Sequence, residues 1–253
     1  MTQLSKLSAY LDKMLRLDKF PRDPSKNGLQ VEGVETVSKA VFAVDASAAL
    51  FEKAAELDAD FIFVHHGMIW GDGLQNLRGH TARRLRTLFS NGISLYAAHL
   101  PLDAHPRLGH NALLAKIAGI KKWTFFGEYA GALIGACGTL PGSSTPSALA
   151  KKFTASIGGK HKIFGNASQK IRRIGIISGG AAAEVTDAVK LGLDCFVTGE
   201  AGHSDYNLLI ESGLPVIALG HYASETPGIH AVMAEIRKNF KIPCEFVDLP
   251  TGL

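Results

Sequence analysis

Residues 60–67 read DFIFVHHG, a short apolar run that ends at two histidines and a glycine. Four consecutive apolar residues between polar ones are typical of a strand that is buried on both faces. His65 and His66 then lie at the carboxyl end of that strand, which is the edge where open α/β sheets bind ligands. Adjacent strand residues point to opposite faces, and we expect Gly67 to turn the chain sharply enough for both imidazoles to reach one site.

The histidine pair by itself also has a purely structural interpretation. One histidine can be a hydrogen-bonded core residue while the other faces water, and short motifs often match by chance. The rest of the chain decides between the two interpretations.

Strands and helices alternate on both sides of this stretch. The first half reads as helix 4–15, strand 40–44, helix 47–57, strand 61–64, helix 81–89, strand 93–97 and helix 108–118, with a loop at 24–33. Alternation of this kind predicts right-handed crossovers and a parallel sheet.

The alternation breaks between residues 123 and 170, where the chain is rich in glycine and predicts one helix at 146–157. It resumes with strands 173–177, 195–197, 215–219 and 244–249 and with helices 181–191, up to 212, and 228–240. We therefore expect two interlinked α/β lobes with largely parallel sheets. Residues 1–120 form the first lobe, 121–170 an irregular basic segment of the second, and 171–253 a second βα series whose C-terminal part packs back on the first lobe.

Composition indicates a globular protein of the cytoplasm. The 253 residues are 46% hydrophobic and 20% charged and include 27 glycines, as in chains with a large core and many tight turns. No apolar stretch approaches the roughly 20 residues of a membrane span, and the amphipathic N-terminus lacks the apolar core of a signal peptide. The scattered Cys137, Cys195 and Cys244 indicate small buried apolar residues, not a disulfide framework or a thiolate metal site.

Positive charge is concentrated in one tract. No acidic residue lies between Glu128 and Glu184, whereas seven basic residues do: Lys151, Lys152, Lys160, Lys162, Lys170, Arg172 and Arg173. Such a tract can attract phosphorylated ligands if it faces a cleft. It can equally be a solvated basic surface with nothing bound.

Histidines and carboxylates follow nearly every predicted strand. They are Asp45, His65, His66, His99 and Asp103 in the first series and Glu200, His203, His221 and Glu225 in the second. Taken singly each has a structural explanation, and Glu225 would suit the N-terminus of the following helix. Together they are the ligand types of a nitrogen and oxygen metal site, gathered at the sheet edge where α/β sites form.

The histidine pair, Asp103 and the His221-x3-Glu225 set exceed what one tetrahedral ion requires when a position stays open. Two divalent ions about 3.5–4 Å apart, bridged by a carboxylate and a water, would use all five groups. Zn, Fe, Mn, Ni and Co all suit mixed imidazole and carboxylate ligands.

Five motifs carry a resemblance to a known family: NGLQVEG (27–33), VHHGMIWG (64–71), AAHLPLDAH (97–105), TGEAGHSDY (198–206) and GHYASETPG (220–228). Together they resemble the NGG-interacting factor three family, whose bacterial members are often named GTP cyclohydrolase type 2 homologues. The resemblance implies interlinked α/β lobes, a di-metal site between them and a ring-shaped homohexamer. It places the metal ligands on His65, His66, Asp103, His221 and Glu225. The chain has H-L-P-L-D at 99–103 where other members often have H-T-x-L-D, so the pocket shape can differ while the ligand Asp103 is retained.

These features lead to a metal-dependent hydrolase as the first hypothesis, with a nucleotide such as GTP or a related small molecule as substrate. A water bridging the two cations would be the nucleophile. His99, Glu200 and His203 are candidates for proton transfer or for supporting the metal ligands.

The alternative hypothesis is a metal-binding scaffold or regulatory protein that recognises protein or nucleic acid through the basic tract. Phe153 and Phe164, the aromatic residues among the basic residues of 151–173, have the spacing of core residues, so they do not predict a stacking platform for bases. A purely structural role comes third, because structural proteins rarely need so many ionisable groups at one edge.

Overall fold

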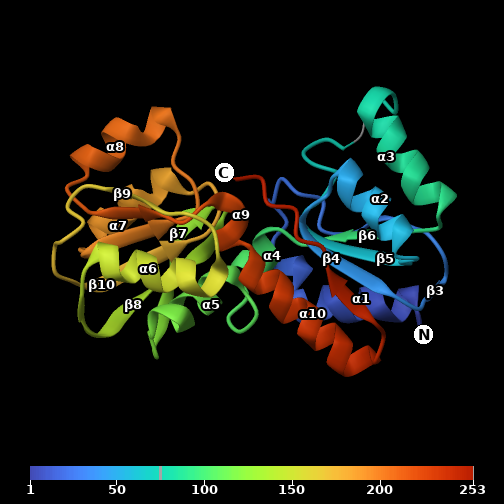
Figure 1. Cartoon of the computed structure of the whole chain (residues 1–253), viewed down its shortest axis with the longest axis horizontal. Helices are drawn as coiled ribbons and strands as arrows, with labels where there is room; N and C mark the ends of the chain where they lie inside the picture. Colours follow the sequence, from blue (N-terminus) through green and yellow to red (C-terminus); the bar gives the residue numbers. More distant parts are fainter. Residues whose placement is uncertain (74–75, 253) are drawn as a thin grey trace. The chain divides into compact units, whose positions relative to one another are not determined.

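The computed structural model describes residues 1–73 and 76–252, and the chain divides into two compact α/β units. The first unit contains Met1–Leu102 and Ile229–Leu249, and the second contains Asp103–Gly228 together with the residues from Pro250. Each unit is built on one sheet with parallel central strands (Figure 1). The chain therefore leaves the first unit, completes the second and returns.

The first unit contains a five-stranded sheet in the order β13-β4-β5-β6-β2. Its strands are β13 (Cys244–Phe246), β4 (Ala40–Asp45), β5 (Phe61–His66), β6 (Ser94–Ala97) and β2 (Gly28–Val31), beside a small antiparallel pair of β1 (Thr2–Gln3) and β3 (Thr36–Val37). The first four strands of the order are parallel, whereas β2 runs antiparallel to β6. The sequence predicts a loop at 24–33, but that segment supplies this edge strand.

Helices cover both faces of the first sheet. They are α1 (Leu4–Leu15), α2 (Ala48–Glu56), α3 (Gly79–Ser90) and α10 (Thr226–Phe240), with the short η1 (Leu17–Lys19) and α4 (Leu100–Asp103). Figure 1 shows α2 and α3 on one side of the sheet and α1 and α10 on the other. Leu50 of α2 and Leu88 of α3 pack with Ile62 of β5, while Tyr96 of β6 donates to Asp12 of α1 over 2.8 Å on the opposite face.

The central strand β5 is longer than its apolar run. Phe61 to Val64 are fully buried, as predicted, but the strand continues through His65 and His66, and His66 pairs with Asp45 of β4. Gly67 serves a different purpose from the predicted sharp turn. A Cβ atom at this position would lie 2.6 Å from Cβ of Ala97 and would collide with the amide of Gln30, so glycine is needed because the backbone passes close to β6 and β2.

The second unit contains a six-stranded sheet in the order β7-β8-β10-β11-β12-β9. Its strands are β7 (Trp123–Tyr129), β8 (Ala132–Ser144), β10 (Ile171–Ile177), β11 (Cys195–Thr198), β12 (Val216–Ala218) and β9 (Lys162–Phe164). Strands β10, β11 and β12 are parallel, and β7, β8 and β9 join them in antiparallel pairs. The segment predicted to be irregular is thus largely sheet.

Helices also cover both faces of the second sheet (Figure 1). They are α5 (His110–Ala118), α6 (Pro146–Ile157), α7 (Val185–Lys190), α8 (Tyr206–Glu211) and α9 (His221–Ser224), with the short η2 (Ala182–Glu184) and η3 (His203–Asp205). Leu114 of α5 and Phe153 of α6 share one core with Ile174 of β10. This packing assigns α5 to the second unit, so the division falls after Leu102 instead of near residue 120.

Burial confirms several expectations about single residues. Phe153 and Phe164 are core residues, and Cys137 and Cys195 are buried free thiols, with the pKa of Cys195 raised by burial. Cys244 is only half-buried. Among the described residues, no helix has the length and apolar character needed to cross a membrane.

Candidate functional site

Three imidazoles gather at the carboxyl ends of two neighbouring strands of the first unit. His65 and His66 end β5, and their ring centroids are 4.5 Å apart. His99 follows β6, and its ring centroid lies 5.1 Å from that of His65 and 5.6 Å from that of His66. One nitrogen of each ring lies within 4.8 Å of the other two nitrogens, which is a spacing that could hold a metal ion.

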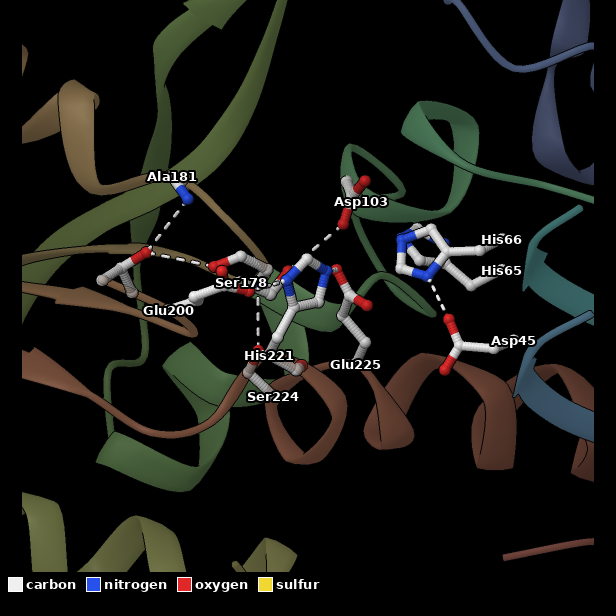
Figure 2. Close-up of polar contacts among 12 residues, drawn as sticks. Asp45, His65, His66, Asp103, Ser178, Ala181, Glu200, His221, Ser224 and Glu225 are labelled. Carbon is white, nitrogen blue, oxygen red and sulfur yellow. Dashed lines mark hydrogen bonds and ion pairs between the residues drawn. The ribbon is translucent and has the colours of Figure 1, made fainter. Parts of the chain in front are cut away.

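Fixed oxygen atoms orient the two histidines of β5. The Nδ1 atom of His65 is 2.9 Å from the carbonyl oxygen of Ala98, and Nδ1 of His66 is 2.7 Å from Oδ1 of Asp45 (Figure 2). A carbonyl or carboxylate oxygen only accepts hydrogen bonds, so each Nδ1 carries the proton. In the neutral ring, Nε2 then has the lone pair that a metal ion requires.

His99 is held in the same way by a buried carboxylate. Its Nδ1 atom is 2.8 Å from Oδ1 of Asp23, whose side chain is fully buried. Asp23 also accepts hydrogen bonds from the backbone N–H groups of Ser25 and Leu100 and from the side-chain amide of Asn27. Burial raises the pKa of Asp23, but the hydrogen bond and charge of His99 and the hydrogen bonds from Asn27 and Ser25 together outweigh it, so the pKa of Asp23 lies below its usual value.

An indole borders the three imidazoles. The ring centroid of Trp70 lies 5.0 Å from that of His99 in an edge-on arrangement and 6.1 Å from that of His66. Its Nε1–H group donates to the carbonyl oxygen of Gly67 over 2.8 Å. The indole is thereby fixed beside the imidazoles and forms an apolar border.

The second unit brings a histidine and a carboxylate together after β12. His221 begins the one-turn helix α9, and Glu225 follows its end. Nε2 of His221 is 3.3 Å from Oε1 of Glu225, which is only 3% exposed. Figure 2 shows these two side chains directed toward one another. The segment between the predicted strand 215–219 and the predicted helix 228–240 therefore contains a helical turn that presents both groups on one side.

Glu200 orients His221 from the end of β11. Its Oε2 atom lies 2.6 Å from Nδ1 of His221, so Nδ1 carries a proton here as well. Although burial alone lowers the pKa of His221, the hydrogen bonds and charges of Glu225 and Glu200 raise it to about 9. A group of opposite charge thus faces each nitrogen of this ring.

A glycine turn after β10 lies against these residues. Gly179 has a φ of +69°, and a Cβ atom there would collide with Oε1 of Glu225. Its N–H group donates to Oγ of Ser224, and that hydroxyl donates to the carbonyl oxygen of His221. The 178–180 turn and α9 are therefore tied together by hydrogen bonds.

Asp103 belongs to a buried polar network of the second unit. The hydroxyl of Ser178 is 3.2 Å from Oδ1 of Asp103, which is 6% exposed. Asn111 accepts from the N–H group of Ser178 and donates to the carbonyl oxygen of Ile134. The network fixes the Asp103 carboxylate at the carboxyl end of β10.

Within each unit, the structure brings several of the predicted residues together. His65, His66 and His99 lie together in the first unit. His221, Glu225 and Glu200 lie together in the second unit, where Asp103 also accepts a hydrogen bond from the hydroxyl of Ser178. His203 is an exposed residue of η3 and, among the described residues, forms no hydrogen bond or ion pair with another candidate.

Sequence reasoning missed the part played by Asp23 and by the carbonyl of Ala98. Asp23 lies in the loop between two prolines, far from any strand exit, and no local pattern links it to His99. A backbone carbonyl has no sequence signal. Asp45 was visible as a strand-exit residue, but its pairing with His66 depends on the register of β4 and β5.

Curated proteins of several organisms are similar over nearly the whole chain. A protein of Pyrococcus horikoshii is 41% identical over 246 residues, covering 97% of each chain, and one of Archaeoglobus fulgidus is 38% identical over 250 residues, covering 99% of each. One of Escherichia coli is 39% identical over 229 residues, covering 90% of this chain and 91% of its own. All three are named GTP cyclohydrolase 1 type 2 homolog.

Solved structures agree with this similarity. A Thermus thermophilus protein matches with a TM-score of 0.89 at 40% identity, and a structural-genomics protein of unknown function matches with a TM-score of 0.90 at 36% identity, each over the full length of both chains. The sequence profile of the family described as Duf34/NIF3 (NGG1p interacting factor 3) matches residues 2–251. The chain therefore belongs to the Duf34/NIF3 family.

Proposed function

We propose that this protein is a metal-dependent hydrolase that binds two divalent ions through His65, His66, Asp103, His221 and Glu225. The observation that carries the proposal is the orientation of the histidines. Each of the three has its Nδ1 atom against an oxygen acceptor, from Ala98, Asp45 and Glu200 respectively. Metal-binding histidines characteristically donate their other ring N–H to a carbonyl or carboxylate in this way.

The spacing of two of these donors suits a metal ion. Two ligands that lie about 2.0–2.1 Å from one tetrahedral ion are separated by about 3.3–3.4 Å. Nε2 of His221 and Oε1 of Glu225 are 3.3 Å apart.

The donor set also limits the kind of ion. Three imidazoles and two carboxylates suit Zn, Fe, Mn, Ni or Co. The cysteines lie elsewhere, because Cys137 and Cys195 are buried in the sheet of the second unit and Cys244 is in β13. A thiolate zinc site is therefore not part of the proposal.

The protein's own residues would have separable tasks in hydrolysis. When bound, the ions would lower the pKa of a coordinated water and stabilise negative charge on the substrate. Asp45 and Glu200 are positioning residues, since each fixes the tautomer and direction of one histidine. Ser178 directs the Asp103 carboxylate, and Gly179 leaves room for Glu225. Trp70 limits the access of water on one side of the imidazoles.

A nucleotide such as GTP is the substrate class that we propose. The support is the name shared by the curated relatives, which describes them as homologues of a GTP cyclohydrolase. We also propose a homohexameric assembly, based on the family resemblance; the mass of the particle in solution, measured by light scattering, tests this separately.

The deciding experiment measures metal and activity on the same sample. Protein purified without chelator is analysed element by element and then screened against nucleotides and phosphoesters. We expect about two ions per chain, with hydrolysis that chelation abolishes and metal restores. Asp103→Asn should lower metal occupancy while the circular dichroism spectrum stays unchanged. Metal-loaded protein without turnover on any substrate of the panel would contradict the hydrolase function.

A further inference from the structure

We infer that His65, His66 and His99 form a metal site of the first unit by itself, able to bind one divalent transition-metal ion without the carboxylates of the second unit. The site shares two ligands with the proposed dinuclear centre and rests on the proposed function to that extent. His99 is the added ligand, and no carboxylate ligand is required.

The three rings have the spacing of a site that is nearly formed. One nitrogen from each ring lies within 4.8 Å of the others, whereas three ligands of one tetrahedral ion lie about 3.3–3.4 Å apart. Side-chain rotations would close this difference when an ion binds. All three residues come from the ends of the paired strands β5 and β6, so the backbone beneath them is fixed.

Protonation prepares the same three rings for a cation. Each Nδ1 atom is held by an oxygen acceptor, and in the neutral rings the lone pairs are on the Nε2 atoms. Three neutral imidazoles with an open fourth position are the ligand set of one class of zinc enzymes. The first unit therefore contains the ligands of a complete mononuclear site.

Asp23 distinguishes His99 from an ordinary polar residue at a strand end. Four donors hold its fully buried carboxylate, and one of them is His99. Outer partners of this kind restrict a metal-binding histidine to one orientation. The competing explanation is that the pair only ties the loop around Asp23 to β6, and the experiment is designed to separate the two.

Trp70 supplies a local reporter of metal binding. The chain has two tryptophans, and Trp123→Phe leaves only Trp70, whose ring lies 5.0 Å from that of His99. Ni²⁺ or Co²⁺ bound to the imidazoles should quench its fluorescence strongly. The titration is performed on the full chain, with and without His221→Ala and Glu225→Gln, which remove two donors of the second unit.

We expect the His221→Ala/Glu225→Gln protein to bind one Ni²⁺ per chain, with quenching that is complete at one equivalent. Adding His99→Ala should weaken this binding by about tenfold or more, as should His99→Gln, which can still donate a hydrogen bond to Asp23. His80→Ala is the matched control, because His80 is an exposed histidine of α3 in the same unit, and it should leave the titration unchanged.

The outcomes separate this inference from the proposed function. If the parent protein binds two ions but the His221→Ala/Glu225→Gln protein binds none, the independent site is refuted and the dinuclear centre stands. An unchanged affinity in folded His99→Ala and His99→Gln proteins also refutes it, and assigns His99 to the structural pair with Asp23. If the double variant binds one ion and the parent binds only one, the inference stands and the dinuclear centre fails.

Discussion

The two units present their candidate metal-binding groups in different chemical forms. The first unit offers imidazoles from the ends of two parallel strands, each oriented by a carbonyl or carboxylate behind it. The second unit offers two buried carboxylates and one histidine, held by a glycine turn and a one-turn helix. Rigidity in the first unit comes from strand pairing, and in the second from a hydrogen-bonded network.

The imidazoles and the carboxylates would contribute differently to binding a cation, the first through position and the second through charge. Neutral imidazoles select a transition metal and fix its position, but they do not neutralise its charge. Asp103 and Glu225 would supply the negative charge, and burial makes each carboxylate costly to keep without a cation. Removing an acid from the second unit should therefore affect binding more than altering any partner in the first unit.

Glu225→Gln is the strongest test of this contrast. The substitution keeps the shape of a side chain that is 3% exposed but removes its charge. We expect the affinity for the second of the two ions to fall by more than about 100-fold, beyond the effect of an outer partner, while the fold persists. Glu211→Gln, at an exposed position of α8, is the control. Full metal occupancy in Glu225→Gln would remove this residue from the ligand set.

Loss of an orienting carboxylate should have a smaller effect in either unit. Asp45→Ala and Glu200→Ala leave His66 and His221 in place without their Nδ1 partners. We expect metal affinity to fall by about 10–100-fold in each variant, with little change in the melting temperature, because both carboxylates are partly exposed.

The conservative variants Asp45→Asn and Glu200→Gln retain an oxygen acceptor and should recover part of this loss. Glu52→Ala, on the exposed surface of α2, is the control for the first unit. A fall in melting temperature with unchanged metal affinity would show that the two residues act only on stability.

Close packing behind the histidine pair gives a third test, which acts on stability. In Gly67→Ala the added methyl group meets Cβ of Ala97 at 2.6 Å and also the amide of Gln30. Overpacking of this kind typically costs about 1–3 kcal/mol, so denaturant unfolding should show a loss in that range. Gly71→Ala is not a matched control, because Gly71 has a positive φ; Gly142→Ala is suitable, since nothing lies within 4 Å of its added Cβ. An unchanged unfolding midpoint in Gly67→Ala would mean that β2 and β6 shift enough to accommodate the added methyl group.

Regular periodicity explains which parts of the fold were visible in the sequence. Phe61 to Val64 form a fully buried strand, and Thr145 and Pro146 begin α6 at the predicted residue, because an N-cap and a first-turn proline are local signals. Strand β8 was missed, since its glycines interrupt the alternation on which strand prediction depends.

The candidate groups were visible for a different reason from the contacts between them. His65, His66 and His221 follow apolar runs, and the carboxyl ends of parallel strands meet at one edge. The partner of each imidazole depends on register or on a loop far away in the sequence, as with Asp23 and His99. Neither relation has a local pattern, so the sequence suggested the groups but not how they are oriented.

Two acids outside the candidate groups extend the comparison to pH. Asp23 in the first unit is buried and Glu184 in the second is half-buried, but only Asp23 is surrounded by donors, and the pKa of Asp23 is lowered. The pKa of Glu184 is raised, first by burial and then by the charge of Asp187, although a backbone hydrogen bond opposes this. Removal from water is thus accompanied by a lowered pKa where hydrogen-bond donors surround the carboxylate, as at Asp23, and by a raised pKa where they do not, as at Glu184.

The smallest expected effect is therefore a gain in stability from Glu184→Gln. Because the folded-state pKa of Glu184 lies above the unfolded value, the folded state holds this proton more tightly, and stability falls as pH rises through the two pKa values. At pH 7 the neutral amide of glutamine avoids the cost of keeping a charged carboxylate partly removed from water. We expect roughly 0.5 kcal/mol or less of added stability for this half-buried side chain. Below pH 4 the carboxyl group is protonated in both states, so the difference from the parent protein should shrink. Urea unfolding of both proteins at pH 7 and pH 3.5 measures this, and a gain that is equal at the two pH values would show that charge is not its cause.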